Sequence, residues 1–164
     1  MSTNRILKLE SAGSEQTEQI AEKLAVNLKG GSVLELISDL GGGKTTFVRG
    51  LARGLGSPDH VTSPTFKLSN LYNVPEQKNS EWDDIHRIYH YDFYRLADSG
   101  LMGNELHESL SDPNGLVVVE WGKVVARVLP KDRISITFVQ TSDHRRHLVV
   151  DCPIGLKFVL EGLI

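Results

Sequence analysis

Apolar and polar positions along the chain follow two different periods, one typical of strands and one typical of helices. Residues 5–10 alternate and predict a short strand, whereas apolar residues recur every fourth position over 14–29 and predict a helix. The unbroken aliphatic run 32–37 is typical of a strand buried in a parallel sheet. Apolar positions from Phe47 to Leu55 then predict a second helix, which closes at Gly56.

The rest of the chain continues this alternation of strands and helices. Further strands are predicted at 66–72, 85–91, 116–119, 134–139 and 147–150, a short helix at 101–110, a polar surface loop at 74–84 and a final amphipathic helix at 156–163. Strands that alternate with helices favour an α/β fold with a mostly parallel central sheet. With 164 residues the chain has the length of one domain, so we expect residues 1–164 to form a single unit.

Composition and charge narrow the classes of protein further. The chain is 40% hydrophobic and 24% charged, which is ordinary for a folded domain and argues against disorder, collagen or a coiled coil. Its 18 basic and 21 acidic residues give a net charge of −3. A protein that wraps nucleic acid by itself usually carries a basic excess, so if RNA is relevant to this protein, we expect it to act through a partner.

Cysteine content and hydropathy bear on the compartment. The chain has a single cysteine, Cys152, which excludes an intramolecular disulfide framework and a four-cysteine zinc site. No apolar run has the ~18–20 residues that a membrane span needs, and no charged-then-apolar signal peptide opens the chain. We therefore expect no zinc, no membrane contact and a cytoplasmic protein.

The strongest chemical signal is the glycine-rich segment between the strand at 32–37 and the helix that follows it. Glycines allow backbone N–H groups to converge on an anion, and the start of the helix adds its partial positive charge. Lys44 would then reach the β- and γ-phosphates and the Thr45 hydroxyl would bind Mg²⁺. Ser38 stands where the phosphate-loop pattern has its first glycine. The alternative is a glycine-rich turn with an incidental Lys-Thr pair.

Two carboxylates follow predicted strands and are candidates for the same site. Glu120 ends the apolar run 116–119, and Asp92 follows the strand at 85–91 within the segment His90-Tyr91-Asp92-Phe93-Tyr94-Arg95. In phosphate-loop folds a strand-end acid lies near the metal, so Asp92 and Glu120 are predicted to converge on one Mg²⁺-nucleotide. Taken alone, Glu120 could be an exposed strand-end residue, and the aromatic segment around Asp92 a packed junction with a structural His90.

A third candidate is the loop Thr62-Ser63-Pro64-Thr65-Phe66. Its hydroxyls follow the second predicted helix, where switch loops contact the γ-phosphate in many phosphate-loop proteins. An ordinary Ser/Thr-Pro turn explains the same residues equally well.

Taken together, four motifs resemble the bacterial TsaE (YjeE) family in identity and order, over essentially the whole domain. They are Asp39-Leu40-Gly41-Gly42-Gly43-Lys44-Thr45-Thr46-Phe47, Thr62-Ser63-Pro64-Thr65-Phe66, His90-Tyr91-Asp92-Phe93-Tyr94-Arg95-Leu96 and Val119-Glu120-Trp121. The resemblance implies a phosphate-loop NTPase-like three-layer sandwich that binds ATP with Mg²⁺ and hydrolyses it weakly alone. It also implies a role in threonylcarbamoyladenosine modification of tRNA beside the anticodon, exerted on a TsaB–TsaD-type heterodimer rather than by transferring the group itself.

The same resemblance assigns roles to individual residues. Asp92 and Glu120 would act on the metal or the attacking water, with Thr45 and Glu120 at the metal. Thr62, Ser63 and Thr65 would form a switch-like loop. The nucleotide would be bound by Asp39, Leu40, Gly41, Gly42, Gly43, Lys44, Thr45, Thr46 and Trp121.

Three segments differ from the family pattern. Ser38 replaces the usual glycine, residues 74–84 lengthen the stretch before His90, and residues 98–102 replace an acidic run that is common after Leu96. How the base is recognised is left open by the motifs, and residues 141–146 are a candidate for it.

Other functions remain open at this point. A small-molecule kinase would need several arginines around an acceptor, for which Arg127, Arg133, Arg145 and Arg146 are available. A GTP-driven switch is disfavoured because the chain has no N-K-x-D segment. A nucleotide-dependent interaction module, in which hydrolysis is incidental, overlaps with the family interpretation.

Overall fold

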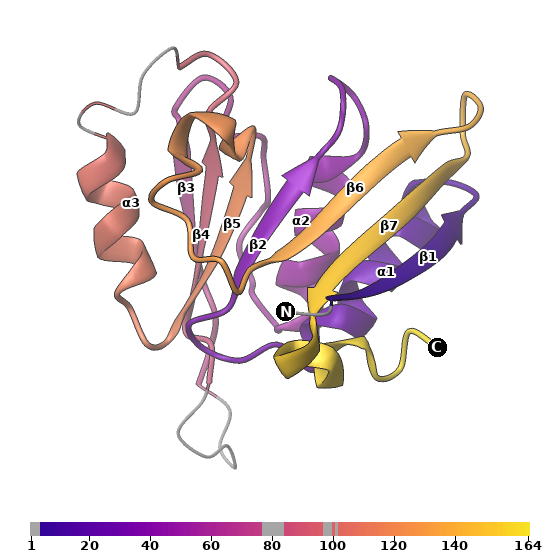
Figure 1. Cartoon of the computed structure of the whole chain (residues 1–164), viewed down its shortest axis with the longest axis horizontal. Helices are drawn as coiled ribbons and strands as arrows, with labels where there is room; N and C mark the ends of the chain where they lie inside the picture. The colour runs from indigo at the N-terminus through magenta and orange to yellow at the C-terminus, as the bar shows by residue number, and fades with distance from the viewer. Residues whose placement is uncertain (1–3, 77–83, 97–99, 101) are drawn as a thin grey trace.

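A single seven-stranded sheet organises the chain in the computed structural model, which describes residues 4–76, 84–96, 100 and 102–164 (Figure 1). The strand order is β1-β7-β6-β2-β5-β4-β3. The strands are β1 (Asn4–Ser11), β2 (Val33–Ile37), β3 (Ser69–Asn73), β4 (Arg87–Asp92), β5 (Gly115–Glu120), β6 (Ile134–Gln140) and β7 (Arg146–Pro153).

The direction of the strands changes from the centre of the sheet to its edges. β2 pairs in parallel with both β5 and β6, and β4 pairs in parallel with β5. At the edges, β3 pairs antiparallel with β4, and β1 and β6 pair antiparallel with β7. The predicted parallel sheet is thus confirmed for the middle of the fold, and short antiparallel pairings complete it on both sides.

Helices cover both faces of this sheet and make three layers. α1 (Ser14–Ala25) and α2 (Lys44–Gly54) pack together on one face, and α3 (Met102–Leu110) lies on the other (Figure 1). Side chains of β5 alternate between the two faces: Leu116 and Val118 join the core under α1 and α2, while Val117 and Val119 join the core beside α3. A central strand buried on both faces explains why this segment is an unbroken apolar run.

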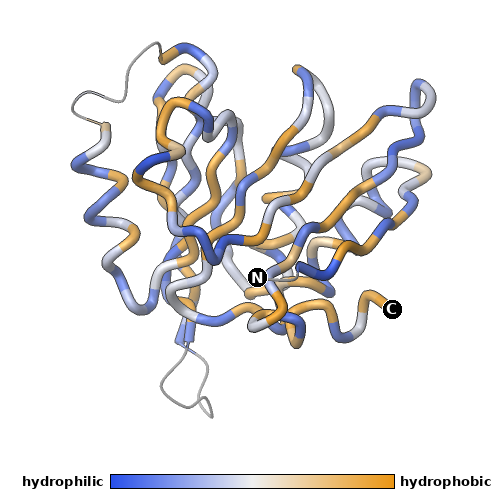
Figure 2. Tube along the Cα trace, viewed as in Figure 1, coloured by the Kyte–Doolittle hydropathy of each residue, from blue (hydrophilic) through white to orange (hydrophobic). Residues whose placement is uncertain are grey.

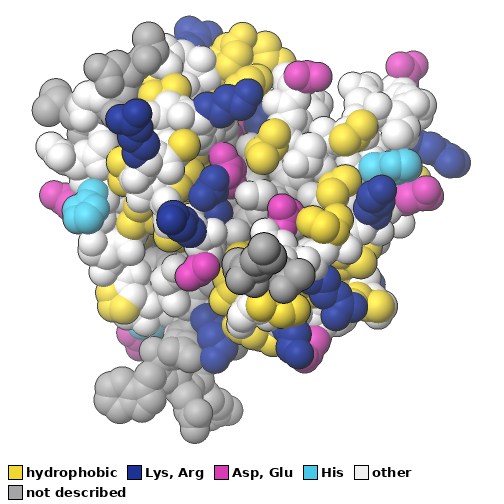
Figure 3. All heavy atoms as spheres, in the orientation of Figure 1, with side chains coloured by type: hydrophobic (Ala, Val, Ile, Leu, Met, Phe, Trp, Pro, Cys, Tyr) yellow, Lys and Arg dark blue, Asp and Glu magenta, His cyan; other side chains and the backbone are white. Residues whose placement is uncertain are grey.

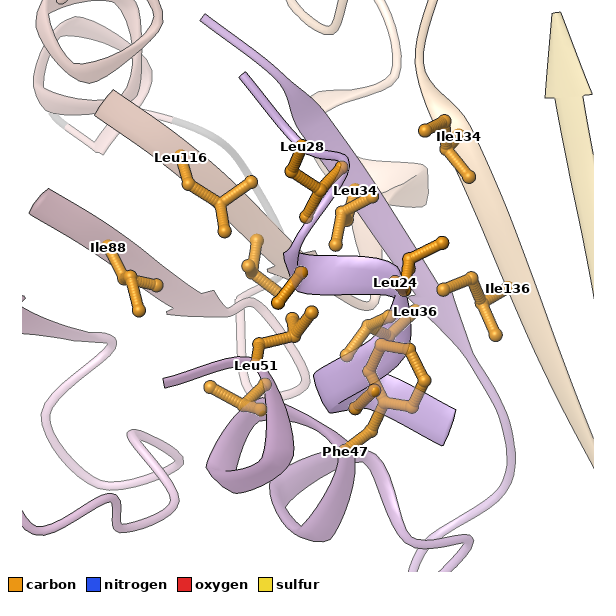
Figure 4. Packing of buried hydrophobic residues seen from close by; sticks show 14 of the residues in the cluster. Leu24, Leu28, Leu34, Leu36, Phe47, Leu51, Ile88, Leu116, Ile134 and Ile136 are labelled. Atoms are coloured by element: carbon orange, nitrogen blue, oxygen red, sulfur yellow. The ribbon is translucent and has the colours of Figure 1, made fainter. Parts of the chain in front are cut away.

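The larger core lies between the sheet and the α1–α2 pair. Figure 2 shows hydrophobic positions gathered along the central strands and hydrophilic ones at turns such as the tip of the β6–β7 hairpin. Phe47 packs edge-on against Phe138 with ring centroids 5.5 Å apart. Figure 4 shows buried side chains of α1, α2, the segment after α1 and the central strands gathered in one interior. The labelled ones are Leu24, Leu28, Leu34, Leu36, Phe47, Leu51, Ile88, Leu116, Ile134 and Ile136.

Several predicted boundaries are wrong by a few residues. α1 ends at Ala25 rather than at residue 29, because its last turn tightens into bonds from Asn27 N to Leu24 O and from Leu28 N to Ala25 O. The strand predicted at 66–72 begins at Ser69, because the amides of residues 67 and 68 bond back to the Pro64 carbonyl. Phe66, expected in that strand, is 83% exposed.

The remaining predictions concern the C-terminal segment and stretches that lie partly outside the described residues. The final segment forms a 3-10 helix over Ile154–Leu160, not the amphipathic helix expected at 156–163. The predicted loop at 74–84 and the segment 98–102 include positions 77–83, 98–99 and 101, which lie outside the described part of the chain. α3 is described from Met102 onward.

Surface features agree with the balanced composition. On the face shown in Figure 3, basic, acidic and apolar side chains are interspersed, without one continuous field of either sign. Among the described residues, no helix combines the length and the apolar character that a membrane crossing requires.

Gly50 permits the close approach of α1 and α2. A Cβ built on Gly50 would lie 2.7 Å from Cβ of Ala21 and 2.8 Å from Cα of Glu18, which is closer than real contacts. Replacing a glycine by alanine in a helix interior ordinarily stabilises by about 0.8–1 kcal/mol. Here the two helices would have to separate.

We therefore predict that Gly50→Ala lowers the free energy of unfolding by about 1–3 kcal/mol, measured by urea denaturation. Gly155→Ala is the control, because a Cβ there meets nothing within 4 Å. A Gly50→Ala protein as stable as the wild type would contradict this packing.

Candidate functional site

The carboxyl ends of the central strands meet at one edge of the sheet, where ligands bind in open α/β folds. The glycine loop at 38–43 leaves the end of β2, Asp92 is the last residue of β4 and Glu120 is the last residue of β5. Asp92 and Glu120 lie opposite each other in the parallel β4–β5 register. The topology therefore brings together residues that are 28 positions apart in the sequence.

A pocket of about 240 Å³ opens at this edge. It is lined by Leu40, Gly41, Gly42, Gly43, Lys44, Thr45, Thr46, Ser63, Thr65, Asp92, Glu120 and Trp121. The predicted loop, carboxylates and switch hydroxyls thus border one space. Two predicted residues, Asp39 and Thr62, are not part of its lining.

The glycine loop has the backbone geometry expected for an anion site. Gly41 and Gly43 have φ values of +76° and +96°, which residues with a side chain rarely adopt. Gly43 caps α2, so the free N–H groups of the first turn of this helix face the pocket lined by Lys44, Thr45 and Thr46. The first turn of α2 carries no acidic residue that would compete for the same place.

Lys44 lies buried at the floor of this pocket, with 6% of its surface exposed. Its Nζ donates to Ser38 Oγ at 2.8 Å and to the Asp39 carbonyl at 3.2 Å. Glu120 Oε2 lies 4.0 Å from the same nitrogen, and the Trp121 ring centroid lies 5.1 Å away. The ammonium group is therefore held in place by neutral oxygens, an indole face and one distant carboxylate.

Ser38 is a site residue whose part sequence reasoning missed. Its hydroxyl accepts from Lys44 and donates to the Asp39 carbonyl at 2.7 Å. The serine that replaces the usual loop glycine thus contacts the lysine directly. Asp39 also takes part through its backbone carbonyl.

Glu120 is fixed by a buried histidine. His90 Nε2 lies 2.8 Å from Glu120 Oε1, and the two residues are 0% and 3% exposed. Within the described part of the chain, Nδ1 of His90 has no hydrogen-bond partner. A structural His90, as the sequence suggests, is compatible with this burial, and its partner is a candidate site residue. His90 and Asp92 are two residues apart on β4, so both lie on one face of the strand.

Tyr72 packs beside this pair. Its ring lies 6.2 Å from that of His90, centroid to centroid, and its hydroxyl donates to the Thr62 carbonyl at 2.8 Å. Burial raises the pKa of the Tyr72 phenol above its usual value, so it remains a protonated donor. Thr62 is thereby held beside β3, away from the pocket lining.

Asp92 is oriented from two sides. Thr65 Oγ1 donates to Asp92 Oδ2 at 2.6 Å, and the Tyr94 amide donates to Oδ1 at 2.9 Å. The hydroxyls of Ser63 and Thr65 lie 2.7 Å apart. The loop that was predicted to act as a switch is thus tied to the β4 carboxylate through Thr65.

The side chains around the pocket that could contact a metal ion carry oxygen donors. Across residues 4–76, 84–96 and 102–164, no three His, Cys, Asp or Glu side chains gather closely enough to hold a metal ion. Mg²⁺ usually keeps several waters and takes one or two protein oxygens together with substrate phosphates. Thr45, Asp92 and Glu120 supply oxygens of that kind around the pocket.

Trp121 separates this pocket from a larger one of about 520 Å³. Trp121 has a φ of +57°, and its ring packs against Tyr94 at 4.9 Å between centroids. The larger pocket is mainly apolar and is lined in part by Ile37, Phe93, Leu96 and Val124. Its lining also includes Ser38 and Asp39, which Lys44 contacts, but neither Lys44 nor Glu120.

Comparison with known proteins shows which family the chain belongs to. The sequence model of the family described as "Threonylcarbamoyl adenosine biosynthesis protein TsaE" matches residues 11–148, which include every residue of the pocket. The chain belongs to the TsaE family.

Relatives named tRNA threonylcarbamoyladenosine biosynthesis protein TsaE match most of this chain. The Bacillus subtilis protein is 35% identical over 146 residues, 87% of this chain and 83% of the relative. The Treponema pallidum protein is 36% identical over 123 residues, 75% of this chain and 84% of the relative. The crystal structure of Bacillus subtilis YdiB matches with a TM-score of 0.73 at 30% identity, over 99% of this chain and 97% of that one. The fold of YdiB is therefore shared over nearly all of this chain.

We predict that His90→Ala destabilises this TsaE-family protein by about 1–3 kcal/mol, because Glu120 would remain buried without its donor. His90→Gln, whose amide can replace one ring nitrogen, should recover part of the loss. Urea denaturation of the three proteins measures the difference. Equal stability of His90→Ala and wild type would mean that the pair contributes nothing to the fold.

Proposed function

We propose that this chain binds Mg²⁺-ATP at the glycine loop and hydrolyses it in support of threonylcarbamoyladenosine modification of tRNA. The observation that carries the proposal is the position of Glu120, between the loop lysine at 4.0 Å and His90 at 2.8 Å. A buried lysine beside glycine-rich backbone favours phosphate, and a strand-end carboxylate next to it favours phosphoryl chemistry.

Phosphate binding would use groups that already face the pocket. Oxygens of the β- and γ-phosphates would take the place of Ser38 Oγ and the Asp39 carbonyl around Lys44 Nζ, which now donates to both. An ammonium–phosphate bond is charge-assisted and stronger than these neutral ones, so the exchange favours the nucleotide. The N–H groups at the start of α2 would donate to the same phosphates.

The hydroxyl of Thr45 and the carboxylate of Glu120 would hold Mg²⁺, which neutralises charge on the phosphate oxygens when it is bound. Asp92, kept in place by Thr65 and the Tyr94 amide, would orient a water beside the terminal phosphate. His90 holds one oxygen of Glu120, which leaves the other directed to the Lys44 side of the pocket. Hydrolysis would thus depend on how precisely these carboxylates are positioned.

The biological output follows from family membership. We infer that the ATPase acts with a TsaB–TsaD-type heterodimer and that tRNA is met through this complex, in the cytoplasm. The net charge of −3 is consistent with indirect contact with tRNA. In this account the chain does not transfer the threonylcarbamoyl group itself.

A small-molecule kinase is supported less well by the site. Arg133, one of the four arginines considered for an acceptor site, donates to Glu35 Oε2 at 2.6 Å and is engaged in the fold. The larger pocket, which shares Trp121 with the pocket around Lys44, is mainly apolar, whereas an acceptor for phosphoryl transfer is polar. The ATPase proposal therefore accounts for more of the site.

Lys44→Ala should weaken Mg²⁺-ATP binding by about 1.5–3 kcal/mol, or roughly 10- to 150-fold, since it removes a charge-assisted phosphate contact. Isothermal titration calorimetry measures the change. Lys157→Ala, an exposed lysine in the 3-10 helix at 154–160, is the matched control and should bind as the wild type does. Unchanged affinity of Lys44→Ala would mean that the loop does not bind phosphate.

Glu120→Ala tests whether hydrolysis serves the modification. The variant should still bind ATP and the TsaB–TsaD-type pair, but should not sustain repeated threonylcarbamoyladenosine formation on tRNA in a reconstituted reaction. Glu161→Ala changes an exposed carboxylate and should behave as wild type. Full modification by Glu120→Ala would favour the alternative of an interaction module in which hydrolysis is incidental.

A further inference from the structure

Arg146 lies directly over the glycine loop. It is the first residue of β7, and its side chain is half-buried, whereas the neighbouring Arg145 is exposed. A Cβ built on Gly43 would overlap Nη1 of Arg146 and would lie 3.3 Å from its Cζ. The guanidinium therefore occupies the space that a side chain at position 43 would fill.

The backbone of Arg146 is held firmly at this place. It pairs with Gln140 of β6 and with Ser11 of β1, so it is fixed by strands on both sides. The hairpin turn before it is closed by bonds from the amides of Thr141 and Ser142 to the Arg145 carbonyl, at 2.9 and 3.3 Å. Only the side chain is free to adjust.

The guanidinium also lacks a protein counterion. Among the described residues, no carboxylate or other acceptor forms an ion pair or hydrogen bond with the Arg146 side chain. Other arginines of the chain do have such partners: Arg53 contacts Glu18 at 2.8 Å and Arg133 contacts Glu35 at 2.6 Å. A half-buried cation beside an anion-binding loop is available to a ligand.

The arrangement of the pocket shows which end of a nucleotide would reach Arg146. A volume of about 240 Å³ is below the ~300–1,000 Å³ typical of whole small-molecule sites, so the triphosphate would fill it and the nucleoside would extend outside. Arg146 is not among the residues that line this pocket, and β7 and β5 lie on opposite sides of β2, from which the glycine loop leaves. The function proposed above puts the terminal phosphate beside Glu120, at the end of β5. The nucleoside then leaves on the other side, toward the β6–β7 hairpin.

We propose that Arg146 binds the nucleoside end of the nucleotide, donating to the α-phosphate and lying along the sugar and base. This inference rests on the proposed ATP binding and adds a residue outside the family motifs. A planar guanidinium suits both tasks, because it bonds phosphate oxygens in pairs and stacks on aromatic rings. Among residues 141–146, which are a candidate segment for recognising the base, the proposal selects Arg146.

Calorimetric titration with Mg²⁺-ATP and Mg²⁺-ADP tests the proposal in four proteins: wild type, Arg146→Ala, Arg146→Lys and Arg145→Ala. Arg146→Ala should lose roughly 10-fold or more in affinity for both nucleotides. Arg146→Lys should recover part of the loss, because it keeps the charge but not the plane. Arg145→Ala removes the same charge one residue away and should change affinity by less than about twofold.

The outcomes separate this inference from the proposal on which it rests. Wild-type binding with equal affinities for Arg146→Ala and Arg145→Ala would overturn the role of Arg146 alone. A wild type that binds neither nucleotide would overturn ATP binding itself, and this inference with it. Urea denaturation verifies that the variants are folded, and Arg146→Gln replaces Arg146→Ala if the latter is not.

Discussion

The burial of the Lys44 ammonium group is the constraint on which the site depends. A cation taken out of water is costly unless it is paired and hydrogen-bonded. Lys44 is only 6% exposed. Its ammonium group donates hydrogen bonds to two neutral oxygens, at 2.8 and 3.2 Å, and the nearest carboxylate oxygen, that of Glu120, lies 4.0 Å away. The surroundings thus tolerate the charge while leaving room for a stronger anion. In the proposed function, phosphate oxygens would replace the two neutral oxygens around the ammonium group.

The fold supplies the supports that this lysine needs. Parallel pairing of β2, β4 and β5 brings three strand ends to one edge, which places Glu120 and Asp92 near the loop. Close packing of α1 on α2 through Gly50 fixes the helix whose first residue is Lys44. The binding geometry is therefore a consequence of backbone pairing and helix packing, and the side chains of the pocket are held by bonds between themselves.

Much of this arrangement could be predicted from local patterns, and the rest could not. The strand, loop and helix around Lys44 could be predicted because their signals follow one another along the sequence, from Val33 to Gly54. The strand-end acids could be predicted because an apolar run stops at a carboxylate. Contacts across the sheet could not. The hydrogen bonds between His90 and Glu120 and between Tyr72 and the Thr62 carbonyl join residues from different segments of the chain, so no local sequence pattern predicts them. Ser38 departs from the phosphate-loop pattern, but its hydroxyl accepts a hydrogen bond from Lys44.

The most direct test of the account is the rate of ATP hydrolysis by the purified protein with Mg²⁺, first alone and then with a TsaB–TsaD-type pair and tRNA. The account predicts a slow rate for the isolated chain that rises when the pair is added, because the carboxylates beside Lys44 are already placed and a partner would complete their alignment. ATP that binds but turns over at the same rate with and without the pair would contradict it, and would leave a nucleotide-binding fold without the proposed role in tRNA modification.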